Sequence, residues 1–266
     1  MKPLHIFCDE TGTLTNVNVK ELYGFGWVVV GESKVRAVEN LLKENDLDKI
    51  HVKNIRGRKR KVKLAEKLNT IFGGKDLVMG GSVIRKDPEF VKGIVDRNIN
   101  KQKINFPSHD FSSAEAKQYK VVRLQEIAFL ATRYALLGAI RKFGIREVNI
   151  HFSAVIDEHL HGCSIKSIED KILNGLNELI AYSEKLGLMK IPGLVVPSNI
   201  NINVKAKSDE IFGLADFFAS IGNLAMSEDQ DRRNCGCEMY ESAKNLFPER
   251  FFLEGVEPLP GIFVRD

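Results

Sequence analysis

The segment from Phe212 to Ser220 reads FGLADFFAS, and its residues are apolar or small except for one aspartate, Asp216, near the middle. A helix of this composition is apolar around most of its circumference and must be buried. Burial of an ionised carboxylate is costly unless it is paired with a cation or binds a metal. The sequence therefore predicts a helix over 212–225 inside a core, with a partner for Asp216.

The bulk composition is sufficient for such a core. The chain has 266 residues, of which 44% are hydrophobic, and this allows a sizeable buried interior. No segment approaches the roughly 18 uninterrupted apolar residues of a membrane helix, and the apolar run at the N-terminus is too short for a secretion signal. We therefore expect a cytoplasmic protein without a membrane partner. The formal charge of +4 permits a nucleic-acid partner without requiring one.

Alternating runs of β-branched and helix-forming residues predict an α/β fold. Expected strands are Leu4–Cys8, Tyr23–Val30, Leu77–Ile84, Val148–Ile156 and Ile200–Val204, and expected helices are Val35–Asn45, Lys61–Phe72, Ser112–Gly144, Ile165–Leu186 and Phe212–Ala225. The first strands follow one another like a meander, and the later ones alternate with helices. This order favours a single domain over residues 1–266, with a mixed sheet flanked by helices.

Two further aspartates follow predicted strands. Asp9 comes just after the first strand, and Asp157 just after the fourth. In open α/β sheets ligands bind beyond the carboxyl ends of the strands, so parallel neighbours would present both carboxylates at one edge. Each could instead be an ordinary turn residue, and Asp216 could cap a helix or meet a basic side chain. Taken together, the three aspartates favour one shared site.

Three clustered carboxylates suit a hard cation that prefers oxygen ligands. Mg²⁺ is typically held by one or two carboxylates together with waters and substrate phosphates. Two such ions, about 4 Å apart, can activate a water and stabilise the departing oxygen in phosphodiester cleavage. The predicted ligands are Asp9, Asp157 and Asp216.

The most basic stretch of the chain is Lys53–Lys63, which reads KNIRGRKRKVK. Such a run can bind the phosphate backbone of a nucleic acid without reading its sequence. It can also be no more than the solvated start of a helix. The candidate substrate-binding residues are Lys53, Arg56, Arg58, Lys59 and Arg60.

The segment Asp9–Thr15, DETGTLT, is similar to the nucleophile motif of haloacid dehalogenase-like phosphotransferases. That resemblance implies that Asp9 is a covalent nucleophile. Phosphotransferases of this class also carry a late acidic pair that binds magnesium, as Gly-Asp or Asp-Asp. The chain contains neither dipeptide.

A second resemblance rests on three motifs in order. They are Asp9-Glu10-Thr11-Gly12, Ile156-Asp157-Glu158 and Leu214-Ala215-Asp216-Phe217-Phe218. They resemble the family called domain of unknown function 3800, although Thr11 replaces the usual serine and Gly213 stands where a glutamine is common. The resemblance implies a ribonuclease H-like fold with antiparallel first strands and later parallel ones.

The second family also implies a functional assignment. It makes Asp9, Asp157 and Asp216 ligands of Mg²⁺ or Mn²⁺, with Glu10 as a possible fourth carboxylate, and Lys53 matches a lysine that often follows the second strand in that family. We therefore expect a metal-dependent nuclease or a related phosphodiester-cleaving enzyme. A nucleic-acid-binding or regulatory module of the same fold, without turnover, is the alternative from another functional class.

Overall fold

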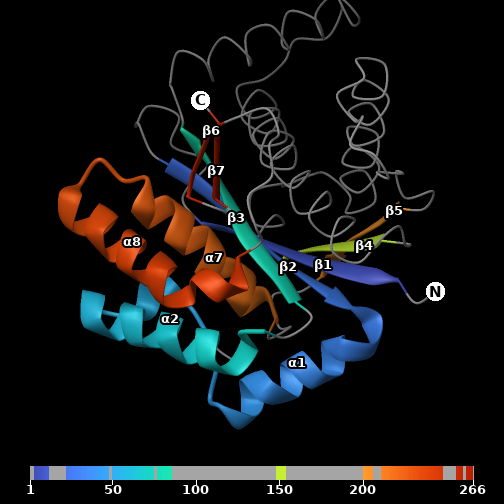
Figure 1. The fold of residues 1–266 in the computed structure, drawn as a ribbon. Helices are drawn as coiled ribbons and strands as arrows, with labels where there is room; N and C mark the ends of the chain where they lie inside the picture. The colour runs from blue at the N-terminus through green and yellow to red at the C-terminus, as the bar shows by residue number, and fades with distance from the viewer. Residues whose placement is uncertain are drawn as a thin grey trace, which may run out of the picture.

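The structure is a computed structural model of the chain. It describes residues 3–11, 22–47, 50–74, 77–85, 148–153, 200–205, 211–247, 256–259 and 262–265. In these residues seven strands form one sheet, in the order β5-β4-β1-β2-β3-β7-β6 (Figure 1). The strands are β1 (Leu4–Thr11), β2 (Leu22–Gly31), β3 (Leu77–Arg85), β4 (Val148–Ser153), β5 (Ile200–Lys205), β6 (Val256–Leu259) and β7 (Ile262–Arg265).

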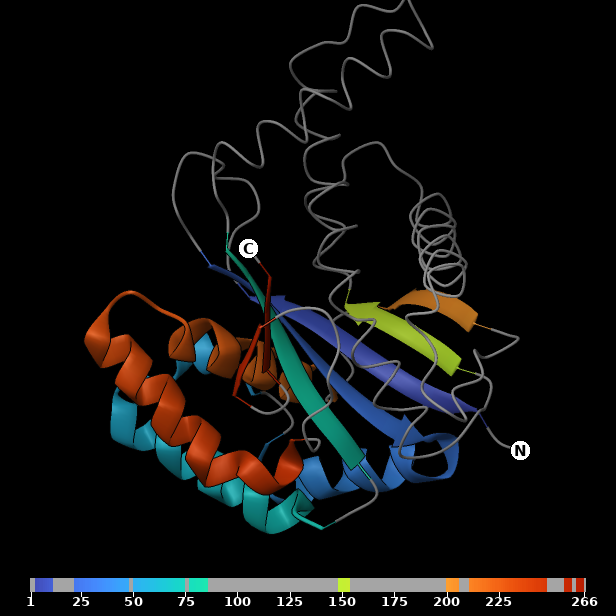
Figure 2. The ribbon, with the colours of Figure 1, turned by 45° about the horizontal axis from the view of Figure 1, so that its top comes forward.

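The helical elements come from two parts of the chain. They are α1 (Glu32–Glu44), η1 (Val52–Asn54), α2 (Arg58–Phe72), α7 (Ile211–Ala225), α8 (Gln230–Ala243) and η2 (Lys244–Leu246). Figures 1 and 2 show α1, α2, α7 and α8 on one side of the sheet. Helix α7 lies directly against β1, β2 and β3, and α8 packs on both α7 and α2.

The register of β1 positions the candidate site. β1 is antiparallel to β2, with Asp9 opposite Gly26, and β2 is antiparallel to β3. On its other side β1 pairs in parallel with β4, where Phe7 is opposite His151. β5 continues this parallel arrangement beyond β4. β7 pairs in parallel with β3 and antiparallel with β6. β1 thus has an antiparallel neighbour on one side and a parallel neighbour on the other, as β3 and β7 also have.

The two faces of the sheet carry different apolar residues because successive side chains of a strand point to opposite faces. The face toward α7 contributes Phe7, Val28, Val30, Leu77 and Met79 to a core that also includes Leu42, Leu68, Phe72, Phe212, Ile221 and Met239 from the helices. The alternate positions Leu4, Ile6, Cys8, Trp27 and Val29 are also buried. Both faces of β1 and β2 are therefore covered, which explains their aromatic and β-branched composition.

The mixed α/β fold, its antiparallel first three strands and its flanking helices are confirmed. The predicted bounds of β2, β3, β5 and α7 agree with the structure to within one residue. Of the fifteen residues of α7, all except Gly213 and Asn223 are buried, as the sequence requires. The described part of β4 ends at Ser153, and the helices expected over 112–144 and 165–186 lie outside the described residues.

One helix of the described structure is not predicted from the sequence. α8 begins after Asp229, whose side chain accepts a hydrogen bond from the backbone N–H of Arg232 and so caps the helix. Its buried residues Cys235, Met239 and Ala243 recur every four positions. That spacing and the capping aspartate are the signals that could have found it.

No helix in the described ranges combines the length and the apolar character needed to cross a membrane.

Candidate functional site

Asp216 lies on α7 and is only 6% exposed. Its Oδ2 accepts a hydrogen bond from the backbone N–H of Val52 at 3.3 Å, and it lies 3.2 Å from Nδ1 of His51. Both contacts come from the segment at the start of η1. The lone carboxylate of the apolar helix is therefore partnered, as its burial demands.

Gly213 explains how the segment before η1 comes so close to α7. A Cβ atom at this position would lie 3.1 Å from the carbonyl oxygen of Ile50, so a larger residue would push the segment away. Gly213 precedes Asp216 by one helical turn and lies on a neighbouring part of the same surface. Gly213 thus allows close contact between α7 and the residues that bind Asp216.

His51 is a site residue that sequence reasoning missed. Its side chain is 29% exposed, so the ring joins the buried Asp216 carboxylate to the surface. The two residues are 165 positions apart in the chain. No local pattern links residues at that separation, and the only signal is that His51 directly precedes the basic stretch.

The predicted position of Asp9 is wrong. The sequence places Asp9 after the end of the first strand, but β1 continues to Thr11 and Asp9 lies inside it. The reason is the antiparallel ladder with β2, which continues through Glu10 opposite Phe25 and Thr11 opposite Gly24. Tertiary pairing therefore overrides the turn preference of the DETG segment. In the described parallel ladder with β4, the last pair is Cys8 with Phe152, and Asp9 follows it.

Asp9 and Asp216 lie on β1 and α7, two elements that pack against each other. Phe7 shares a face of β1 with Asp9, and its ring meets Phe212 edge-on with centroids 5.6 Å apart. Gly26, opposite Asp9, contacts α7 so closely that a Cβ atom there would lie 1.9 Å from the carbonyl oxygen of Ala215. Ala215 is the neighbour of Asp216. Asp9 is 2% exposed, so each of these two packed elements carries a buried carboxylate.

The other predicted carboxylates are not placed at the site by the structure. Asp157 lies outside the described residues, and of Glu10 only the backbone position in β1, opposite Phe25, is described. Within the described ranges, no three His, Cys, Asp or Glu side chains form a group that could hold a metal ion. Of the three predicted ligands, the structure therefore describes two, Asp9 and Asp216.

Two histidines on the same face as Asp9 were also missed. His5 Nδ1 lies 2.7 Å from His151 Nε2, and the two rings are nearly parallel. His151 also stacks on Phe7, with centroids 4.8 Å apart, and is buried. In such a hydrogen bond one imidazole nitrogen donates and the other accepts without a proton. His5, His151 and Asp9 therefore lie on the same face of β1 and β4.

The reactivity of Cys8, the residue before Asp9, can be used to test whether this part of β1 is buried. Burial raises the pKa of the Cys8 thiol well above its usual range, and the negative charge of Asp9 raises it further. Because the thiolate is the reactive form, we expect Cys8 to resist iodoacetamide in the native protein. Cys237 on α8 is partly exposed and serves as the internal reference.

Peptide mass spectrometry after timed alkylation measures this difference. Cys237 should be labelled first, and Cys8 only when urea is added. Equal labelling rates for the two thiols would show that β1 opens readily, and Asp9 would then not be a buried carboxylate.

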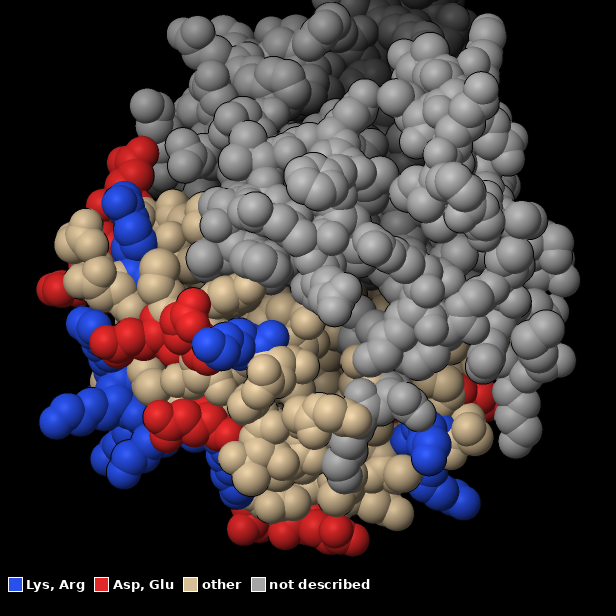
Figure 3. All heavy atoms as spheres, viewed as in Figure 1, with Lys and Arg blue, Asp and Glu red and all other residues tan. Residues whose placement is uncertain are grey.

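The candidate substrate-binding residues lie on η1, at the start of α2 and, in the case of Arg56, in the link between these two elements. Lys53, Arg56, Arg58, Lys59 and Arg60 are all exposed. Three of them occupy the first turn of α2, so the stretch is indeed the start of a helix. Lys and Arg side chains gather on the face drawn in Figure 3, at the end of the molecule where Figure 1 places α2. Arg58 alone among the five makes an ion pair within the described residues, with Glu238 of α8.

No protein-family model matches the chain, and no curated protein is significantly similar to it.

Proposed function

We propose that this protein is a divalent-metal-dependent phosphodiesterase, a nuclease, with a ribonuclease H-like fold. The observation that carries the proposal is the burial of two aspartates from remote segments, Asp9 and Asp216, on two elements that pack against each other, β1 and α7. Buried acidic groups are costly, and a shared cation is a common reason for keeping two of them together. Asp157 is proposed as the third ligand, and Glu10 as a possible fourth carboxylate.

The chemistry of Asp216 fits a cation ligand. Within the described residues, both of its hydrogen-bonding partners meet Oδ2. Oδ1 therefore retains the lone pairs that a hard cation uses. Hydrogen bonds to a ligating carboxylate fix its orientation and are part of the design of metal sites. On this proposal Val52 and His51 are positioning residues for Asp216.

A bound Mg²⁺ or Mn²⁺ would supply a Lewis acid that polarises a phosphoryl oxygen and lowers the pKa of a bound water below that of bulk water. The remaining contributions come from the chain itself. Asp9 and Asp216 hold charge at the interface, and α7 excludes water from it because nearly all of its residues are buried. Lys53 is close to the site in the chain, since it is the residue after Val52 and two residues after His51. It can therefore hold a substrate phosphate beside the carboxylates.

The basic residues beyond Lys53 support a nucleic-acid substrate. Arg56, Lys59 and Arg60 are exposed and occur on the same continuous segment of η1 and α2. Cations of this kind contact backbone phosphates and position a nucleic acid without specifying its sequence. The proposed substrate is therefore a polynucleotide rather than a small phosphodiester.

The test is a cleavage screen over single- and double-stranded DNA, RNA and hybrids, with Mn²⁺ or with a chelator. We expect cleavage that requires the metal and is lost in Asp157→Asn. The matched control is Asp46→Asn, the same chemical change in the turn after α1, where φ is 54° and asparagine is well tolerated. Binding without cleavage of any substrate would favour the alternative, a nucleic-acid-binding module without turnover.

The phosphotransferase interpretation fits the fold less well. That class requires parallel strands throughout its sheet, whereas β1 and β2 are antiparallel. In addition, Asp9 is buried within this ladder, while a nucleophile must reach its substrate. Transfer of a phosphoryl group to Asp9, detected by mass spectrometry, would support that interpretation instead.

A further inference from the structure

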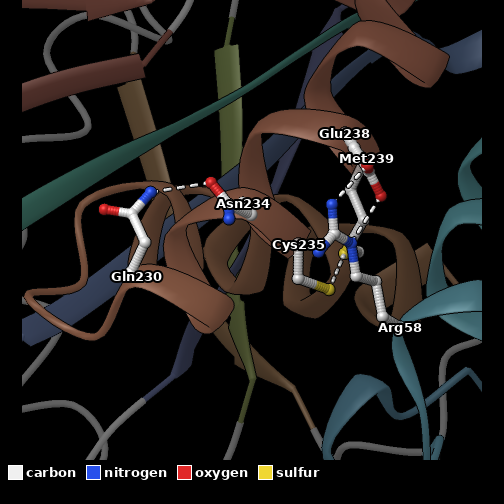
Figure 4. A network of polar contacts seen from close by, with 6 residues as sticks. All are labelled: Arg58, Gln230, Asn234, Cys235, Glu238 and Met239. Atoms are coloured by element: carbon white, nitrogen blue, oxygen red, sulfur yellow. Dashed lines mark hydrogen bonds and ion pairs between the residues drawn. The ribbon is translucent and has the colours of Figure 1, made fainter.

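Arg58 and Glu238 are joined by a two-point ion pair between α2 and α8. Nε of Arg58 donates to Oε2 of Glu238 at 2.7 Å, and Nη2 donates to Oε1 (Figure 4). This paired arrangement is the one in which a guanidinium binds a carboxylate or a phosphate. The side chains remain 43% and 49% exposed, so the pair lies on the surface.

Cations outnumber carboxylates around this pair, although the negative charge of Asp231 in the first turn of α8 also acts on Arg58. The first turn of α2 contains no acidic residue, and Arg58 to Lys61 are four consecutive cations. Cations are unfavourable there, because the N-terminus of a helix carries a partial positive charge. The hydrogen bond from Arg58 lowers the pKa of Glu238, which therefore stays ionised at neutral pH. Glu238 neutralises one cation of a surface otherwise suited to an anion.

The pair is not needed to hold the two helices together. α2 and α8 pack through buried residues, among them Ala65, Leu68, Cys235 and Met239. An exposed ion pair adds little stability of its own. A variant that breaks it should keep its fold, so its effect on binding can be measured directly.

We propose that Glu238 occupies a phosphate-binding position on Arg58, and that a nucleic-acid backbone displaces it when it binds along η1 and α2. The inference rests on the proposed function, because it takes a polynucleotide as the ligand. Glu238 then acts as an internal competitor that weakens binding. The cations that remain open, Lys53, Arg56, Lys59 and Arg60, make the first contacts.

The test is the affinity of the full chain for a fluorescent single-stranded oligonucleotide, measured by anisotropy with a chelator present to prevent cleavage. In Glu238→Gln the guanidinium is free to bind a phosphate, and we expect binding to tighten about two- to fivefold. The dependence of log affinity on log salt should steepen by up to about 0.7, the value for one phosphate contact on a single strand, because the wild-type chain frees the Glu238 carboxylate on binding and that carboxylate takes up a cation, which the variant does not do.

Two further variants isolate the cause. Glu241→Gln removes the same charge from the same helix, but Glu241 pairs with Lys244 rather than with the basic surface. It should show neither the full gain in affinity nor the steeper slope. In the double variant Arg58→Gln with Glu238→Gln, the gain should disappear, because no guanidinium is left to bind the phosphate.

The outcomes separate this inference from the proposed function. If the oligonucleotide binds but Glu238→Gln and Glu241→Gln behave alike, the competition is refuted while the nuclease proposal stands. If the gain persists without Arg58, Glu238 acts through general repulsion, and the displacement is again refuted. If neither the wild type nor any variant binds or cleaves nucleic acid, both proposals fail.

Discussion

Replacement of Gly26 by alanine is expected to destabilise the protein by about 3 kcal/mol or more, the upper end of the cost of overpacking a core. The added Cβ would lie 1.9 Å from the carbonyl oxygen of Ala215 and 2.5 Å from the backbone nitrogen of Ala219. These atoms belong to the α7 backbone and cannot turn aside as a flexible side chain can. The helix must therefore move away from β1 and β2. This movement would separate α7, which carries Asp216, from β1, which carries Asp9.

The measurement is urea unfolding followed by the fluorescence of Trp27, the single tryptophan of the chain, which is buried next to Gly26. Gly31→Ala is the matched control on the same strand, since a Cβ there meets nothing within 4 Å. We expect that control to cost no more than about 1 kcal/mol, because Gly31 is also the N-cap residue of α1, where alanine is less favourable than glycine. If the two variants were equally stable, the close approach of α7 to β2 would be wrong.

The second large effect is expected on metal binding. Asp216→Asn and Asp9→Asn each remove a negative charge while keeping the size of the side chain. We expect each to weaken Mn²⁺ binding by at least about 100-fold, because loss of even an outer contact to a metal ligand costs ~10- to 100-fold. Titration calorimetry measures this directly.

Thermal unfolding gives an independent readout, because a ligand that binds only the folded state raises the unfolding midpoint. Mn²⁺ should stabilise the wild type and the control Asp231→Asn, whose aspartate is exposed at the start of α8. It should not stabilise the two site variants. If Asp9→Asn abolished the response and Asp216→Asn did not, Asp216 would serve only to hold the segment of His51 and Val52 against α7.

The elements predicted correctly are those with a local cause. β2 is a run of aromatic and β-branched residues, and α7 is so apolar that burial is unavoidable. By contrast, the full length of β1 depends on pairing with β2, which the residues after Cys8 do not reveal by themselves. α8 is not predicted because most of its residues are polar and its buried stripe is narrow, with Cys235, Met239, Tyr240 and Ala243 as its buried residues other than glycine.

The residues of the candidate site also differ in whether a local sequence feature indicates them. Its carboxylates were found because Asp216 is anomalous in its own helix and Asp9 follows an apolar run. The partners of Asp216 were not found, because His51 meets it only through the fold. The same holds for Arg58, whose position in a basic run says nothing of the distant Glu238 that neutralises it.

The place of α7 in the chain has a consequence for synthesis on the ribosome. The first three strands emerge early, but the helix that covers their inner face begins only at Ile211. Until then the nascent chain carries Phe7, Val28 and Met79 without the cover that they have in the finished protein. Apolar surface exposed in this way promotes aggregation. Premature termination upstream of α7 should therefore yield insoluble fragments.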